Sequence, residues 1–86
     1  MSKATIGQMM AVANASGVGR ARKWSETEVR VDVGAQYLLL TADEVTLDGA
    51  PMPAIRIASP KGKLPREGGM YAALRKAGEA AGVYTR

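Results

Sequence analysis

The sequence contains neither cysteine nor histidine. Without cysteine, a disulfide framework, thiolate catalysis and a zinc site built on sulfur are all excluded. Without histidine, the chain lacks the side chain whose ordinary pKa of about 6.5 makes it the usual proton shuttle and metal ligand near neutral pH. Most hydrolase chemistries are therefore excluded. We expect a protein that is not an enzyme and that holds no cofactor and no metal ion.

Long hydrophobic runs are also missing. No run approaches the roughly 18 to 20 apolar residues that cross a bilayer, and the polar residues 1–4 lack the apolar core of a signal peptide. Together with the absence of cysteine, these features predict a soluble, cytoplasmic protein that does not contact a membrane.

Phenylalanine is absent as well, and alanine supplies much of the 47% apolar fraction of the 86 residues. Alanine buries little area, so we expect a small core of modest stability. The length leaves room for one domain, residues 1–86, and no second. A chain of this size without disulfides often gains stability by binding a partner, which makes a homodimer one expectation.

The net charge of +4 is unevenly distributed along the chain. Residues 20–23 carry three cations, and residues 26–48 carry six acids against one arginine. Residues 56–86 then carry seven bases against two acids. Such a polarised molecule steers and orients its partners through its electrostatic field.

Local patterns predict an α+β fold. Thr5 and Gln8 form a capping box that begins an N-terminal helix, which ends near Ser16 and Gly17. Valines at 29, 31 and 33 alternate with polar residues, as in a half-buried strand. Gly34-Ala35 fits a type II′ turn, and Asp48-Gly49 is a strong turn signal. The prolines at 51 and 53 keep residues 50–53 out of our predicted sheet. We therefore expect an antiparallel β-meander of about four strands at 27–33, 36–41, 44–47 and 54–58.

A C-terminal amphipathic helix is predicted over residues 66–81, packed on the sheet. Pro65 suits the first turn of a helix, and the apolar stripe consists of Met70, Leu74, Ala77 and Ala81. Gly82 followed by Val83 is typical of a Schellman ending.

Motifs that carry chemistry are incomplete. The glycines at 17 and 19 precede a strand, whereas a dinucleotide-binding turn follows one. Gly62-Lys63 lacks the serine or threonine of a P-loop. Asp43, Glu44 and Asp48 form the only carboxylate cluster, which could hold Mg²⁺ or act as an acid/base pair. Acids that protect a sheet edge from pairing are the more ordinary interpretation.

Two basic segments, which we interpret as loops, remain as candidate binding elements. Mobile backbone, cations for phosphates and an aromatic ring for stacking are typical of nucleic-acid contacts. Solvated charges that only maintain solubility are an equally weighted interpretation. Trp24, as the only tryptophan, is favoured as a core anchor over an exposed platform. The candidate residues are Arg20, Arg22, Lys23 and Trp24 in the first loop and Lys61, Lys63 and Arg66 in the second, with Arg75 and Lys76 expected to line the same face.

These features lead to two functional hypotheses. The first is a non-catalytic binding protein whose basic loops engage an anionic partner, either nucleic acid or a nucleoprotein complex. The alternative is an inhibitor from a phage or other mobile element, anti-CRISPR-like in size and composition, that binds a larger host protein complex. An enzyme that uses only Asp, Glu, Lys, Ser or Tyr would need an acid/base set that the sequence does not offer.

Overall fold

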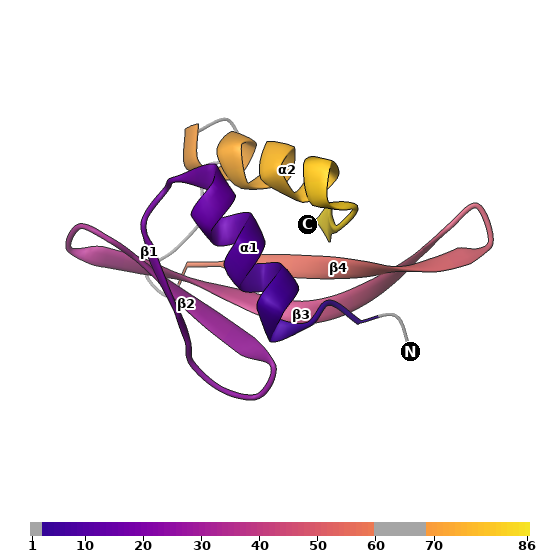
Figure 1. Cartoon of the computed structure of the whole chain (residues 1–86), viewed down its shortest axis with the longest axis horizontal. Coiled ribbons are helices and arrows are strands. Elements are labelled where there is room, and N and C mark those ends of the chain that lie inside the picture. Colours follow the sequence, from indigo (N-terminus) through magenta and orange to yellow (C-terminus); the bar gives the residue numbers. More distant parts are fainter. Residues whose placement is uncertain (1–2, 60–68) are drawn as a thin grey trace.

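The computed structural model describes residues 3–59 and 69–86, and it confirms the α+β class. Strands β1 to β4 form an antiparallel meander, and β5 adds to β4 in parallel, so that the sheet has five strands in the order β1-β2-β3-β4-β5 (Figure 1). The elements are α1 (Ile6–Ser16), β1 (Arg20–Lys23), β2 (Glu28–Val33), β3 (Gln36–Leu47), β4 (Ala50–Ala58), α2 (Gly69–Ala81) and β5 (Tyr84–Thr85).

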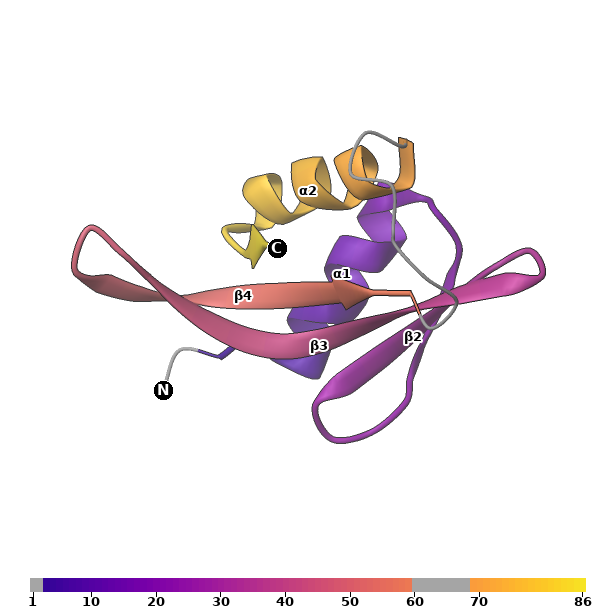
Figure 2. The same ribbon diagram turned by 180° about the vertical axis from the view of Figure 1, so that it is seen from behind.

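Both helices lie on one side of the sheet. Helix α1 crosses in front of the strands in Figure 1, and the view from behind in Figure 2 shows the strands in front of α1. Helix α2 packs against α1 and β5. The core between the helices and the sheet is built mainly from Met9, Val12, Val29, Val31, Leu40, Ile55, Leu74 and Val83. No described helix covers the opposite face of the sheet.

The N-terminal helix forms as predicted. The Thr5 hydroxyl accepts from the Gln8 amide at 3.1 Å, and the Thr5 amide donates to the Gln8 side chain at 2.9 Å. Gly17, in the left-handed region with φ 67°, ends the helix. Neither helix in the described residues is long and apolar enough to span a bilayer.

Both predicted hairpin turns are present. Gly34 has φ 61°, as the first central position of a type II′ turn requires. Asp48 and Gly49 both have positive φ, 51° and 79°, which is the type I′ pattern. These turns fix the register of β2 against β3 and of β3 against β4.

The separate strands predicted at 36–41 and 44–47 are one continuous strand, β3. No glycine or proline interrupts residues 41–44, and the Ala42 amide donates to the Thr27 carbonyl oxygen at 2.8 Å. The predicted break at residues 42–43 was wrong because pairing with Ile55 and Ala54 of β4 keeps these residues extended.

Strand β4 starts at Ala50, four residues earlier than predicted, and includes both prolines. The Ile57 amide donates to the Arg86 oxygen, and the Ile55 oxygen accepts from the Arg86 amide. Odd-numbered residues of β4 therefore direct their backbone groups away from β3. Pro51 and Pro53 share that parity, so their missing N–H groups remove no hydrogen bond to β3.

Residues 20–23, predicted to be a basic loop, form the edge strand β1. They pair with β2 from Arg20 opposite Asp32 to Lys23 opposite Val29. The sequence Arg-Ala-Arg-Lys has no β-branched or aromatic residue, so it gives no local strand signal. Residues 20–23 are extended because they pair with the otherwise unpaired edge of β2. Gly19 permits the approach, since a Cβ there would clash with the Asp32 carbonyl oxygen.

The end of α2 matches its prediction, whereas the predicted residues 66–68 lie outside the described residues. The Val83 amide donates to the Gly78 oxygen at 2.8 Å, and the Gly82 amide donates to the Glu79 oxygen at 3.2 Å. With Gly82 at φ 75°, this is a Schellman motif. It directs the chain into β5 beneath the helix.

Gly78 is required where α2 packs on β5, so Gly78→Ala is expected to destabilise the protein. A Cβ at Gly78 would lie 2.8 Å from both the Thr85 Cγ2 and the Val83 oxygen. Overpacking of this kind costs about 1–3 kcal/mol, which exceeds the helix propensity gained. Gly7→Ala in α1 is the matched control, because its nearest neighbour is 3.8 Å away. Urea unfolding should show a lower midpoint for the first variant and an equal or higher midpoint for the second.

Candidate functional site

The strand register places a polar set of side chains on the sheet face opposite the helices, which we call the open face. Val29, Val31, Leu38, Leu40 and Ile55 are buried against the helices. Side chains alternate along a strand, so their neighbours lie on the other side. The open face thus carries Arg20, Arg22, Glu28, Arg30, Asp32, Tyr37, Leu39, Thr41, Asp43, Arg56, Ala58, Tyr84 and Arg86.

Arg30 occupies the centre of the aromatic–arginine cluster, which consists of Arg22, Trp24, Arg30, Asp32 and Tyr37. Its guanidinium carbon lies 3.8 Å from the Tyr37 ring centroid and 5.0 Å from that of Trp24. Its Nε donates to the Asp32 Oδ1 at 2.9 Å. The Arg30 side chain is 23% exposed. An ion pair and two rings therefore hold this guanidinium in place.

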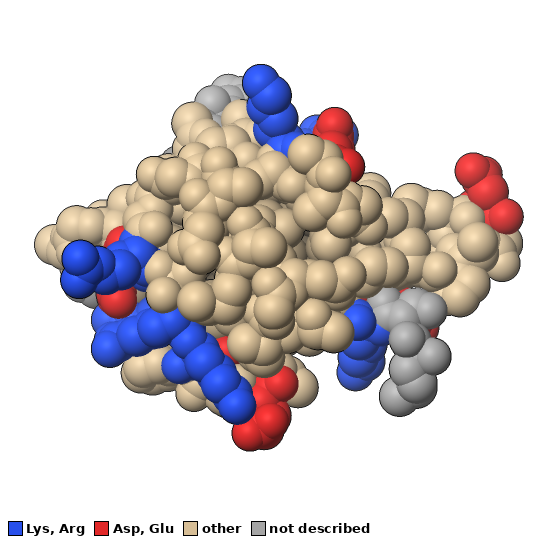
Figure 3. Space-filling model, viewed as in Figure 1, with Lys and Arg blue, Asp and Glu red and all other residues tan. Residues whose placement is uncertain are grey.

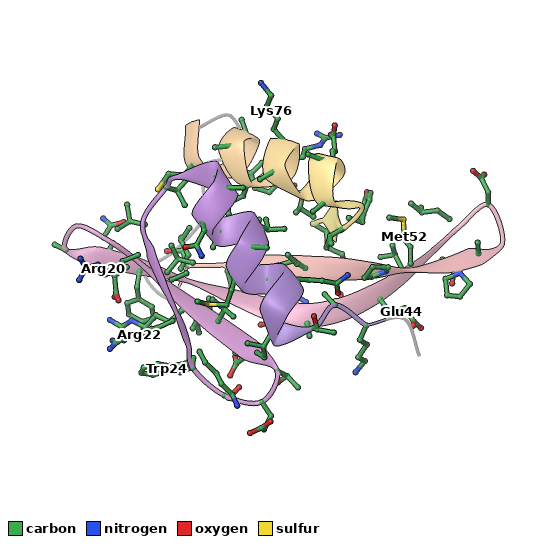
Figure 4. The ribbon with its side chains drawn as sticks, viewed as in Figure 1. Arg20, Arg22, Trp24, Glu44, Met52 and Lys76 are labelled. Atoms are coloured by element: carbon green, nitrogen blue, oxygen red, sulfur yellow. The ribbon has the colours of Figure 1, made fainter. Side chains whose placement is uncertain are left out.

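Trp24 is exposed, at 49%, rather than the core anchor that the sequence favoured. The backbone amides of Trp24 and Ser25 both donate to the backbone carbonyl oxygen of Glu28, at 2.9 and 3.2 Å, where the chain turns from β1 into β2. This position lies beside the sheet surface, beyond the region that the helices cover. The Arg22 guanidinium is 5.7 Å from the indole centroid. Figure 4 shows Arg20, Arg22 and Trp24 along the same edge of the sheet.

Cations exceed acids on the open face. Asp32 pairs with two arginines, at 2.9 Å from Arg30 and at 3.6 Å from Arg22. Near β5, Asp43 likewise has two arginine neighbours, Arg56 at 3.9 Å and Arg86 at 3.7 Å. Each carboxylate balances only one of its two guanidinium groups. Arg20 makes no ion pair with any residue that the structure describes, which adds a further uncompensated charge.

The structure unites only part of the predicted binding set. Arg20, Arg22 and Trp24 lie together, but Lys23 has the opposite strand parity and pairs with Glu26 at 3.2 Å. Arg75 and Lys76 are on α2, where Arg75 pairs with Glu79 at 3.5 Å, and Figure 4 shows Lys76 pointing away from the cluster. The expectation that these cations line one face is therefore wrong for the α2 pair. Lys61, Lys63 and Arg66 lie outside the described residues.

Among the arginine and aromatic members of the open face, sequence reasoning missed five, namely Arg30, Tyr37, Arg56, Tyr84 and Arg86. The alternation of β2 did place Arg30 on a polar side, but among acids that seemed to cancel its charge. Tyr37 begins an apolar run, residues 37–40, that does not alternate and therefore does not indicate which face the ring occupies. A signal existed in the pairing of the hairpin, because the turn at Gly34 sets Tyr37 opposite Asp32 and hence beside Arg30.

The acidic residues 43, 44 and 48 follow β3 into the turn at the far end of the β3–β4 hairpin. Figure 4 shows Glu44 and Met52 pointing to opposite sides of that hairpin. Figure 3 shows Lys and Arg gathered at the β1 end with acidic atoms among them, and further acidic atoms at the hairpin tip, where Asp48 lies. Among residues 3–59 and 69–86, no group of three or more acidic side chains is arranged to hold a metal ion.

No protein-family model matches the sequence, and neither the curated proteins nor the solved structures include a significant match. The chemistry of the open face is thus the basis for a functional interpretation.

The two arginines that share Asp32 are expected to differ in their structural contribution. Arg30→Ala removes a short, half-buried ion pair and two ring contacts, and should lower the free energy of unfolding by about 1–2 kcal/mol. The Arg22 side chain is 59% exposed and lies 3.6 Å from the Asp32 carboxylate. Arg22→Ala should therefore change the free energy of unfolding by less than about 0.5 kcal/mol. Urea denaturation of both variants measures the difference. Equal effects would show that Arg30 is not the better anchored of the two.

Proposed function

We propose that this protein is a non-catalytic binding protein that engages nucleic acid, free or within a nucleoprotein complex, on the open face of its sheet. The observation that supports this proposal is the exposed indole of Trp24 beside a surplus of arginines on that face. Guanidinium groups bind phosphate oxygens with matched geometry, and an exposed ring offers a surface for stacking.

The position of the charges favours binding over simple solubility. Helix α1 has no charged residue, and the helix side of the molecule shows a broad uncharged surface in Figure 3. The open face has five arginines. Two of them form ion pairs with Asp32, and two others form ion pairs with Asp43. Charges that only maintained solubility would not need to compete for the same acid. A polyanion relieves this competition by supplying additional acceptors.

Removal of the β1 arginines should weaken binding and its salt dependence. The double variant Arg20→Ala/Arg22→Ala should lower affinity for a fluorescein-labelled oligonucleotide by about tenfold at roughly 50 mM salt, because two phosphate contacts and their counterion release are lost. The slope of log K against log salt should fall in magnitude by about 2. Fluorescence anisotropy titrations at several salt concentrations measure both quantities.

The matched control is Arg75→Ala/Lys76→Ala, which removes the same charge from α2. It should keep the wild-type slope, since both residues lie on α2, which is on the other side of the sheet. Equal losses in the two double variants would show that net charge alone drives binding. Absence of binding by the wild-type protein at about 50 mM salt would contradict the proposed function.

A second candidate function is binding to a protein with an acidic surface, as an inhibitor of a larger complex would do. The specific observation in its favour is the composition of the aromatic–arginine cluster, because Trp, Tyr and Arg are the residues most enriched at the energetic centres of protein interfaces. The two candidates differ in a nuclease-treated pull-down. A partner that is retained after nuclease digestion and lost in Arg20→Ala/Arg22→Ala supports the protein candidate over the nucleic-acid one.

A further inference from the structure

We propose that the open face selects single-stranded over double-stranded nucleic acid, with an unpaired base stacked on Trp24 and the adjoining phosphates bound by Arg20 and Arg22. This inference rests on the proposed function and specifies the form of its ligand. The observation that supports it is the set of contacts that position the Trp24 indole at the surface.

Trp24 is positioned by charged contacts rather than by burial. The Arg30 guanidinium is near the ring, and it is itself fixed by Tyr37 at 3.8 Å and by Asp32 at 2.9 Å. About half of the Trp24 surface remains accessible. An indole that served only stability would bury more of its surface in a core. Arg30 is therefore a positioning residue, and Trp24 is the residue that contacts the ligand.

An exposed ring on a sheet surface suits unpaired bases. In a duplex the bases are stacked inside, so that a sheet surface meets mostly phosphates and sugars. A single strand can turn its bases toward the protein, where stacking on an aromatic ring is tolerant of sequence. With strands about 4.8 Å apart, the face is about 19 Å wide, which accommodates the two or three bases that such sheets typically stack.

The two arginines around Asp32 have different roles. Arg22 is 3.6 Å from the carboxylate and mostly exposed, and an exposed pair of this kind contributes little free energy. Arg22 can therefore exchange Asp32 for a phosphate, while the hydrogen-bonded Arg30 keeps its place below the indole. Arg56 and Arg86 repeat the arrangement around Asp43 at the β4–β5 side. A nucleic-acid strand with one base stacked on Trp24 can continue across the open face toward Arg56 and Arg86.

The test compares labelled 12-nucleotide oligothymidine and oligouridine with a 12-base-pair duplex at about 50 mM salt. Both single strands are expected to bind at least tenfold more tightly than the duplex. As the only tryptophan, Trp24 also reports directly on its own surroundings. Its fluorescence should be quenched by either single strand and unchanged by the duplex.

Variants of Trp24 test whether base stacking on the indole causes the preference for single-stranded nucleic acid. Trp24→Ala should weaken single-strand binding about 5- to 140-fold, the range for loss of one stacked base, and leave duplex binding unchanged. Trp24→Phe, which keeps a ring, should lose less. Leu47→Ala is the matched control, because Leu47 is a similarly exposed apolar side chain at the distant end of β3. Anisotropy with the labelled oligonucleotides measures all four proteins.

Arg30→Lys tests the positioning role, because it keeps the charge and loses the planar group that stacks. The single-strand preference should fall while the salt slope stays unchanged, whereas the matched Arg75→Lys substitution on α2 should preserve both.

The outcomes are distinguishable. Duplex binding equal to or tighter than single-strand binding, or a single-strand preference that persists in Trp24→Ala, would overturn this inference and leave the proposed function standing. Failure of every probe to bind would overturn both.

Discussion

The pairing of β2 with β3 is the constraint on which the rest of the structure depends. It places Val29 opposite Leu40 and Val31 opposite Leu38, so that one face of the hairpin forms the floor of the core. Side chains alternate with a period of two, so the same register sends Arg30 and Tyr37 to the other face. A slip of one residue would bury the arginine and expose the valines, so burial of the apolar face also fixes the polar one.

From this register the proposed binding surface is assembled in layers. The backbone pairing brings Tyr37 opposite Asp32, the carboxylate holds Arg30, and Arg30 in turn lies beneath Trp24. Each contact is between groups that the sequence separates by only a few residues or by one tight turn. The surface therefore needs no long loop to position it.

Charge competition gives this surface its chemical character. Two arginines near one carboxylate leave a guanidinium with its positive charge only partly balanced, and this happens both at Asp32 and at Asp43. The acids hold the arginines in place in the protein alone, which would reduce the conformational entropy lost on binding the proposed ligand. The same acids limit the net charge, so that in the proposed function a phosphate would replace a weak internal partner at Arg22.

The sequence by itself determined the elements with local signals, namely the capping box of α1, the turns at Gly34 and Asp48-Gly49, and the Schellman ending at Gly82. In each case a few neighbouring residues specify the backbone. It also identified Arg20, Arg22 and Trp24 as candidates. Only the tertiary structure decided that residues 20–23 are a strand, that Trp24 is exposed, and that Arg30, Arg56 and Arg86 share a face with them. Those properties arise from pairing between strands and from where the helices end, and no local pattern of residues encodes either.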